Sequence, residues 1–243
     1  MDKLSRIYGI PCHMVDSTYR LRPASFMDIA QEMAMEGSRE LGFGYDRLSL
    51  EHKAWVLYRM QFTFIRPVLW KEEVTVSTWH KGVDGVLYLR ECEMLDARGE
   101  RAVAATSSWI VMDTSERAFV RPEDLPEYVN PAPQCTEALF ASPAAKVVMP
   151  RGEAPVLLPD HIVTWSDVDF VGHTNNAKYV AWAMDALDAQ FVSEHPVREV
   201  AVNFNHETHL GDVVQMRMCR QGDTFYVDGS VGGRQAFAVK ITF

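Results

Sequence analysis

The chain has 243 residues, of which 47% are hydrophobic and 23% charged, so it can bury one or two cores and is too apolar for a disordered chain. No apolar run reaches the ~18 residues of a membrane span, and the opening residues lack the apolar core of a signal peptide. The net charge of −9, without a run of more than two basic residues, makes nucleic acid a poor partner. Its four cysteines are widely spaced and match neither a zinc motif nor a disulfide framework. We therefore expect a cytoplasmic globular protein with no membrane segment.

The first part of the chain predicts one helix followed by several strands. After a short strand-like opening, apolar residues recur at helical spacing from Phe26 to Leu41, with Ser25 as the expected N-cap and Gly42 as a stop signal. Turn residues separate four runs rich in β-branched and aromatic residues, at 55–65, 74–79, 86–95 and 102–112.

A proline-rich stretch follows. Eight of the twelve prolines lie between Pro122 and Pro159, and such a composition favours an extended connector. This pattern divides the chain into an N-terminal domain at 1–125, a connector at 126–159 and a C-terminal domain at 160–243.

The last part repeats the order of the first. A strand at 161–165 precedes a helix at 176–191, which Thr174 or Asn175 can cap, and four further strands are expected at 200–205, 213–219, 225–231 and 236–243. We interpret this as an internal duplication with an α+β fold, in which each antiparallel sheet wraps its own helix.

The densest polar cluster is DVDFVGHTNNAKYVAW, at 167–182. It places Asp167, Asp169, His173, Asn175 and Asn176 in a turn that leads into a helix N-terminus, where backbone N–H groups carry partial positive charge. This arrangement suits the oxyanion formed when water attacks a thioester or ester, with Asp169 and His173 orienting substrate or water. An ordinary capped turn uses the same residue types, so the residues alone leave both interpretations open.

A second cluster, VNFNHETHLGD at 202–212, has Glu207 between His206 and His209 after a strand. Glu207 can act as a general base or a nucleophile if it meets the first cluster in space; otherwise it belongs to a solvated turn.

Other chemistries fit the pattern less well. The histidines lack the i, i+4 spacing of a helical zinc motif, and no cysteine lies in either cluster, so we expect neither a metal nor a thiol nucleophile. Trp55, Met60 and Trp109 in the first half can fill a core or line a tunnel for an acyl chain.

Taken together, these stretches resemble the acyl-acyl carrier protein thioesterases, a family with a double hotdog fold. The first half carries the resemblance in WVLYRMQFTFIRPVLWKEEVTVSTW and ATSSWIVMDTSERAFVRPEDLP, and the second half in the two polar clusters. The resemblance covers nearly the whole chain. It implies two tandem helix-wrapped antiparallel sheets that form an internal pseudo-dimer, with acyl-chain binding in the first half and catalysis in the second.

By this resemblance, the catalytic residues are Asp169, His173 and Glu207. The expected substrate-binding residues are Asn175, Asn176, Trp55, Met60 and Trp109. Two positions depart from the family, because Val171 replaces its usual catalytic Asn and Thr208 replaces the Cys of some plant members.

The first copy of the repeat has no equivalent chemistry. Superposing the strand patterns puts Pro23 near the position of His173 and Pro67 near that of Glu207, and proline does no acid–base work. One working site is therefore expected.

The implied reaction is hydrolysis of a fatty acyl thioester on the phosphopantetheine arm of acyl carrier protein, which releases free fatty acid in fatty acid biosynthesis. No metal or organic cofactor is implied, and the resemblance leaves room for a homodimer. The alternatives are an acyl-CoA thioesterase and a non-catalytic acyl-binding hotdog protein; the fold also hosts dehydratases.

Overall fold

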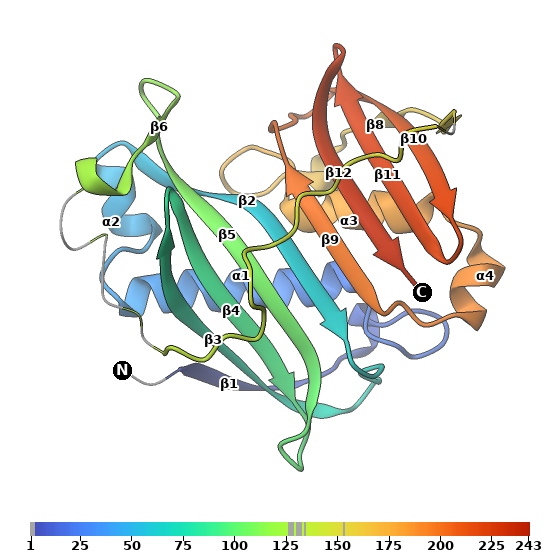
Figure 1. The fold of residues 1–243 in the computed structure, drawn as a ribbon, viewed down its shortest axis with the longest axis horizontal. Coiled ribbons are helices and arrows are strands. Elements are labelled where there is room, and N and C mark those ends of the chain that lie inside the picture. Colours follow the sequence, from blue (N-terminus) through green and yellow to red (C-terminus); the bar gives the residue numbers. More distant parts are fainter. Residues whose placement is uncertain (1–2, 126–128, 130–132, 134, 153) are drawn as a thin grey trace.

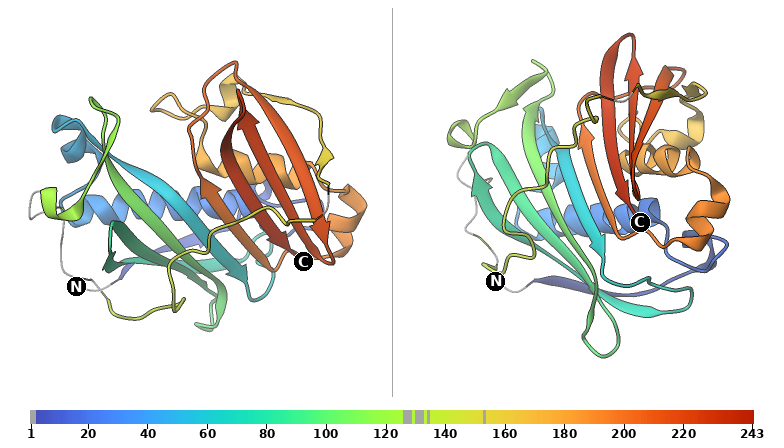
Figure 2. Two further views of the ribbon diagram at one scale, coloured as in Figure 1. Left: turned by 45° about the horizontal axis from the view of Figure 1, so that its top comes forward. Right: turned by 45° about the vertical axis from the view of Figure 1, so that its right-hand side comes forward.

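The computed structural model describes residues 3–125, 129, 133, 135–152 and 154–243 (Figure 1). Within these ranges the strands form one continuous sheet in the order β1-β3-β4-β5-β2-β9-β12-β11-β10-β7, with β6 beside β5 and β8 beside β10. Helices α1 and α3 lie side by side on one face of the sheet (Figures 1 and 2). The α+β arrangement of two helix-wrapped halves is thereby confirmed.

The first half follows the expected order of a helix and then strands. It contains β1 (Leu4–Gly9), α1 (Pro23–Glu40), α2 (Tyr45–Leu50), β2 (Lys53–Phe64), β3 (Glu73–Asp84), β4 (Leu87–Leu95), β5 (Arg101–Asp113) and β6 (Ala118–Val120), with short 3-10 turns at Cys12–Met14 and Pro122–Asp124. The short elements α2 and β6 were not predicted.

The second half contains β7 (Val156–Leu157), β8 (His161–Ile162), a 3-10 turn (Trp165–Asp167), α3 (Asn176–Asp185), α4 (Ala189–Glu194), β9 (Glu199–Phe204), β10 (Val213–Gln221), β11 (Thr224–Val231) and β12 (Arg234–Thr242). The single helix expected at 176–191 is broken into two. Asp188 explains the break, because its Oδ1 accepts the N–H of Phe191 at 2.8 Å and caps a new helix.

Helix α1 begins earlier than expected. Pro23 occupies its first position and Arg22 its N-cap, so Ser25 lies inside the first turn instead of capping it. Proline favours this position because its missing N–H would have no helical acceptor there. The buried face of α1, with Phe26, Met27 and other apolar residues, joins the core cluster that also includes α3 and the strands beneath both helices. No helix in the described ranges has the length and apolar character that crossing a bilayer requires.

The two halves join edge to edge through β2 and β9. These strands pair antiparallel from Arg59 opposite Asn203 to Thr63 opposite Glu199. Each half thus covers a strand edge that would otherwise be open to another chain. The pairing also places the end of β9, where Glu207 follows, beside the first half.

The connector crosses the sheet face opposite the helices (Figure 1). Its expected start at residue 126 lies outside the described residues. Farther along, Glu91 in β4 is fully buried and accepts the N–H of Leu139 at 3.0 Å, while Lys81 Nζ lies 2.5 Å from the same carboxylate. The side chain of Asn203 accepts the N–H of Val147 at 3.0 Å and donates to its carbonyl at 2.7 Å. Buried polar groups on the sheet therefore fasten the extended connector.

Candidate active site

The carboxylate of Asp169 organises the turn before α3. Its Oδ1 accepts the N–H groups of Val171 at 3.0 Å and His173 at 3.3 Å, and the Asp169 N–H donates to the His173 carbonyl at 2.8 Å. Gly172 has a φ of +89°, in the left-handed region that glycine adopts at little cost. Asp169 thus shapes the loop that presents His173, and its Oδ1 faces that loop.

Asp167, from the same cluster, anchors the start of the turn. It forms a capping box with Thr164, whose N–H donates to Oδ2 at 2.8 Å. Burial opposes ionisation of Asp167, yet hydrogen bonds from Thr164 and His161 hold its pKa below the ordinary value. The Asp167 carboxylate therefore stabilises the start of this loop.

His173 and Glu207 meet across two loops from the same half. Nδ1 of His173 lies 3.4 Å from Oε2 of Glu207, and the side chains are 39% and 34% exposed. His209 lies close to both, with Nε2 3.9 Å from Oε1 of Glu207 and its ring centroid 5.0 Å from that of His173. Because the carboxylate remains partly exposed, water can reach it.

A buried hydroxyl cluster beneath this pair holds the two loops in register. Thr208 is fully buried, and its Oγ1 lies 2.6 Å from Oγ1 of Thr174 and 3.0 Å from the hydroxyl of Tyr179. The N–H of Thr174 also donates to the carbonyl of Thr208 at 2.9 Å. Thr208 therefore positions its neighbour Glu207 against the His173 loop. Sequence reasoning noted Thr208 only as a position without a thiol.

The first half contributes a cation that sequence reasoning missed. Arg117, in the turn between β5 and β6, forms an ion pair with Oε1 of Glu207. Asp113 shapes this turn, because its Oδ1 accepts the N–H groups of Ser115 at 2.9 Å and Glu116 at 3.0 Å. Apart from the turn residues around Arg117, nothing in the sequence pattern indicates that Arg117 pairs with Glu207, 90 residues farther along the chain.

The N-terminus of α3 is tied to α1. Asn175 caps α3 by accepting the N–H of Ala177 at 2.9 Å, and its side chain also accepts from Nε2 of Gln31 at 3.4 Å. Asn176 donates to Oε1 of Gln31 at 2.9 Å. The backbone N–H of Asn176 has no acceptor among the described residues, so it is available to a developing oxyanion.

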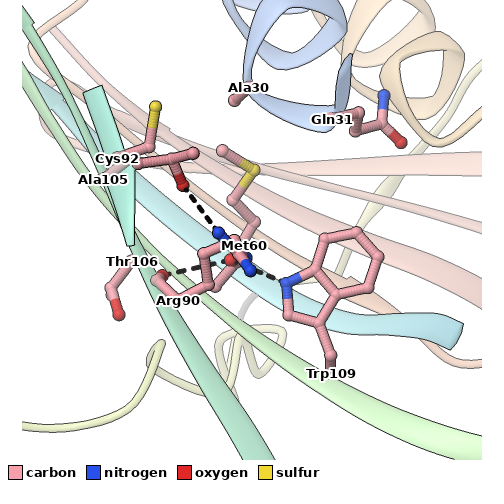
Figure 3. A pocket seen from close by; sticks show the side chains of 10 residues that line it. Ala30, Gln31, Met60, Arg90, Cys92, Ala105, Thr106 and Trp109 are labelled. Carbon is pink, nitrogen blue, oxygen red and sulfur yellow. Dashed lines mark hydrogen bonds between the residues drawn. The ribbon is translucent and has the colours of Figure 1, made fainter. Parts of the chain in front are cut away.

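Gln31 also borders a small cavity in the first half, with room for about one water molecule. Figure 3 shows Met60, Arg90 and Trp109 beneath Ala30 and Gln31 of α1. The cavity lining is completed by Thr78, Cys92, Ala105, Thr106 and Ser107. The structure thus brings the predicted residues Met60 and Trp109 to one cavity, and Gln31 links that cavity to the turn that carries His173.

Trp55, predicted with them, lies elsewhere. Its indole N–H donates to the carbonyl of Phe43 at 3.0 Å, and its ring packs 4.8 Å from that of Tyr88. These residues belong to a smaller core cluster beside α2. Trp55 is not among the residues that line the cavity.

The first half contains a turn with the same backbone hydrogen bonds as the Asp169 turn, but without a histidine. Oδ1 of Asp16 accepts the N–H groups of Thr18 at 2.8 Å and Arg20 at 3.1 Å, and the Asp16 N–H donates to the Arg20 carbonyl at 2.9 Å. Arg20 therefore stands at the position of His173. The expectation that Pro23 does so is wrong, since Pro23 is the first residue of α1 and lies three positions beyond Arg20.

The loop after β2 matches the loop after β9 in the same way. The carbonyls of Val68 and Thr208 accept equivalent hydrogen bonds, from Leu21 at 2.8 Å and from Thr174 at 2.9 Å. Pro67 thus stands at the position of Glu207, as expected. The histidine–carboxylate pair occurs at only one of these two equivalent loop pairs.

Three side chains at the site have the donor types of a metal centre. The ligand atoms of His173, Glu207 and His209 lie within 4.8 Å of one another. A cation bound there would compete with Arg117 for Glu207. His161 is not part of this group, since its Nε2 lies 3.3 Å from Oδ2 of Asp167.

Solved structures share this architecture. An acyl-ACP thioesterase from Bacteroides thetaiotaomicron has a TM-score of 0.85 at 19% identity, over 99% of this chain and 97% of that chain. A 12:0-ACP thioesterase from Umbellularia californica has a TM-score of 0.81 at 18% identity, over 99% and 96%. At these identities the likeness concerns the fold, and it confirms the double hotdog class.

Two family models match the sequence. The acyl-ACP thioesterase N-terminal domain matches residues 1–130, and the acyl-ACP thioesterase C-terminal domain matches residues 158–243. The chain therefore belongs to the acyl-ACP thioesterase family.

Curated plant relatives are longer than this chain. An oleoyl-acyl carrier protein thioesterase from Arabidopsis thaliana is 24% identical over 204 residues, which cover 77% of this chain and 55% of that protein. A palmitoyl-acyl carrier protein thioesterase from Gossypium hirsutum is 25% identical over 222 residues, which cover 87% and 53%. The chain spans about half the length of the curated relatives it matches.

Proposed function

We propose that this protein hydrolyses fatty acyl thioesters of acyl carrier protein and releases free fatty acid. The observation that carries the proposal is the contact of His173 with Glu207, 3.4 Å apart beside the N-terminus of α3. Family membership supports the choice of acyl-carrier-protein thioesters, and the apolar side chains Met60 and Trp109 beside the small cavity below Gln31 support the binding of an acyl chain.

In the proposed reaction Glu207 is the general base. It takes a proton from water while the water oxygen forms a bond to the thioester carbon, and the carbonyl oxygen becomes an oxyanion. The N–H of Asn176 donates to that oxyanion. Collapse of the intermediate breaks the C–S bond, and the proton held by Glu207 passes to the thiolate of the phosphopantetheine arm. His173 orients the carboxylate, and Asp169 acts through the loop that carries His173.

In this proposal one half binds the acyl chain and the other carries out the hydrolysis. Residues 1–125 hold the acyl chain, with Met60 and Trp109 in the cavity wall. Residues 160–243 supply Glu207, His173 and the helix end, and 126–159 connect the two domains. Asn175 and Asn176 contribute to substrate binding by joining α3 to Gln31 at the cavity border.

Replacement of Glu207 tests the function. Glu207→Gln removes the charge at nearly constant volume and should lower kcat on acyl-carrier-protein thioesters by ~10²–10⁴. Glu194→Gln is the matched control, because Glu194 is an exposed residue of α4. Wild-type turnover by a folded Glu207→Gln protein contradicts the assignment, as does an acyl group found covalently bound to Glu207 during turnover.

The carrier is tested separately. Steady-state kcat/KM is measured for the same acyl chain on acyl carrier protein and on coenzyme A, and we expect the carrier-protein substrate to be preferred. Equal or better turnover of acyl-CoA would favour an acyl-CoA thioesterase. Binding of acyl chains without hydrolysis of either substrate would favour a non-catalytic acyl-binding protein.

A further inference from the structure

An arginine is buried in the cavity beneath α1. Arg90 of β4 is 7% exposed and lines the cavity with Met60 and Trp109 (Figure 3). Its Nη1 donates to Oγ1 of Thr78 at 3.3 Å. Among the residues that the structure describes, no carboxylate oxygen lies within 4.0 Å of this guanidinium.

The charge of Arg90 is therefore buried without a counter-charge. A guanidinium has five N–H donors, and the bond to Thr78 engages one of them. Burial lowers the pKa of Arg90 to about 10, so the side chain is still a cation at neutral pH. A desolvated cation with unused donors is stabilised by any hydrogen-bond acceptor that enters the cavity.

Neither α1 nor Ser107, as the structure describes them, accepts a hydrogen bond from the Arg90 guanidinium. A Cβ at Gly37 would lie 2.7 Å from Nη1, so α1 passes over the guanidinium because residue 37 lacks a side chain. The nearby hydroxyl of Ser107 is already engaged, since it donates to the Arg90 carbonyl at 3.2 Å and accepts from Nε1 of Trp109 at 2.9 Å.

We propose that Arg90 selects acyl chains that carry an oxygen acceptor, a hydroxyl or an oxo group, on their distal part. This inference rests on the proposed function, because it takes the cavity, which has room for about one water molecule in this structure, to widen around the acyl chain. A hydrocarbon tail beside Arg90 leaves the guanidinium desolvated, whereas an oxygenated tail accepts a charge-assisted hydrogen bond from it.

The position of Arg90 sets where the oxygen lies. Gln31 marks the end of the cavity near the catalytic turn, and Gly37, above Arg90, is six residues farther along α1. Six residues span about 9 Å of helix. With C–C bonds of about 1.5 Å, an extended chain covers this distance in roughly six to eight carbons. The preferred substituent therefore lies well away from the thioester.

The test compares ω-hydroxyacyl chains with unsubstituted chains of the same length on acyl carrier protein. In the wild type, kcat/KM should favour the hydroxylated chain roughly tenfold or more at the length that reaches Arg90. Arg90→Met should abolish or invert this ratio, and Arg90→Lys should retain part of it. A ratio within one variant cancels any general loss of stability or activity. A wild-type ratio near one, or the same ratio in Arg90→Met, overturns the proposal.

A binding measurement separates this proposal from the proposed function. Free ω-hydroxy and unsubstituted fatty acids are titrated into Glu207→Gln protein by calorimetry, with Arg90 present or replaced by Met or Lys. The hydroxylated acid should bind more tightly only when Arg90 is present. If the wild type hydrolyses no substrate, the proposed function fails while this binding ratio still decides the role of Arg90. Equal affinities for the two acids with Arg90 present overturn it.

Discussion

The carboxylate of Asp16 accepts the same backbone hydrogen bonds in the first half that the carboxylate of Asp169 accepts in the second. Each Oδ1 receives the N–H groups two and four residues ahead, from Thr18 and Arg20 in one copy and from Val171 and His173 in the other. One of these turns presents a histidine to Glu207 and the other presents an arginine near a proline. The arrangement of the aspartate therefore belongs to the turn and does not require catalysis.

This relationship predicts different outcomes for two matched substitutions. Asp16→Ala and Asp169→Ala each remove side-chain bonds to backbone N–H groups and should each lower the free energy of unfolding by ~1–2 kcal/mol. Asp169→Ala should also lower kcat by roughly ten- to a hundredfold, because it releases the His173 loop. Chemical denaturation and steady-state kinetics check both. Equal losses of kcat in the two variants would contradict a positioning role for Asp169.

Thr208 should link stability to catalysis. Thr208→Val leaves Thr174 and Tyr179 without their shared buried partner and should cost ~1–3 kcal/mol of unfolding free energy. Because Thr208 holds Glu207 in register, kcat should fall as well. Thr242→Val is the control, since it breaks a threonine pair with Thr224 between β11 and β12. Unchanged kcat in a destabilised Thr208→Val protein would show that the buried cluster does not position Glu207.

Thiol alkylation should leave activity intact. Cys92 and Cys219 are buried, and burial raises the pKa of Cys92 to about 12, so its thiol is neutral and inaccessible at physiological pH. Alkylation should reach Cys12, which is exposed, and Cys135, which is half-buried. Mass spectrometry identifies the modified residues, and turnover is measured on the same sample. Inactivation traced to one cysteine in a folded protein would refute the carboxylate mechanism.

Val171→Asn tests the position where the family usually has an asparagine. Val171 is 44% exposed, so an amide there can be hydrated and should change stability little. We expect little gain or some loss in kcat, because in the proposed mechanism Glu207, His173 and the α3 N-terminus already supply the base, its orientation and the oxyanion donor. Steady-state rates of the wild type and of Val171→Asn on the same acyl chain test this expectation, with the melting temperature of each protein as a folding control. Activity in Val171→Asn but none in the wild type would identify the natural protein as an acyl-binding protein.

Local patterns were sufficient for most of the fold. Helical spacing between Phe26 and Leu41 corresponds to α1, and the runs rich in β-branched and aromatic residues correspond to the long strands, because local sequence preference and burial agree there. The start of α1 was wrong because the position of Pro23 outweighs the capping preference of Ser25. The break between α3 and α4 was missed because the apolar pattern continues past Asp188.

The site was only partly accessible from sequence. His173 and Glu207 each lie in a polar cluster, and each cluster can be recognised from the sequence alone. Arg117 and Gln31 cannot, because their contacts join the two halves and depend on how those halves pack. The role of Thr208 likewise exists only once two loops are side by side.

Because the connector is bound to the sheet on both sides of Gly152, the molecule should tolerate cleavage of its chain there. Val147 is bound to Asn203 before the exposed Gly152, and β7 pairs with β10 after it. Both sides of a nick at Gly152 would thus stay attached to the sheet, and β2 with β9 and α1 with α3 would still hold the halves together. The two halves therefore resemble two different subunits that one peptide segment connects. Separately expressed halves should complement one another, as fragments of a split enzyme do.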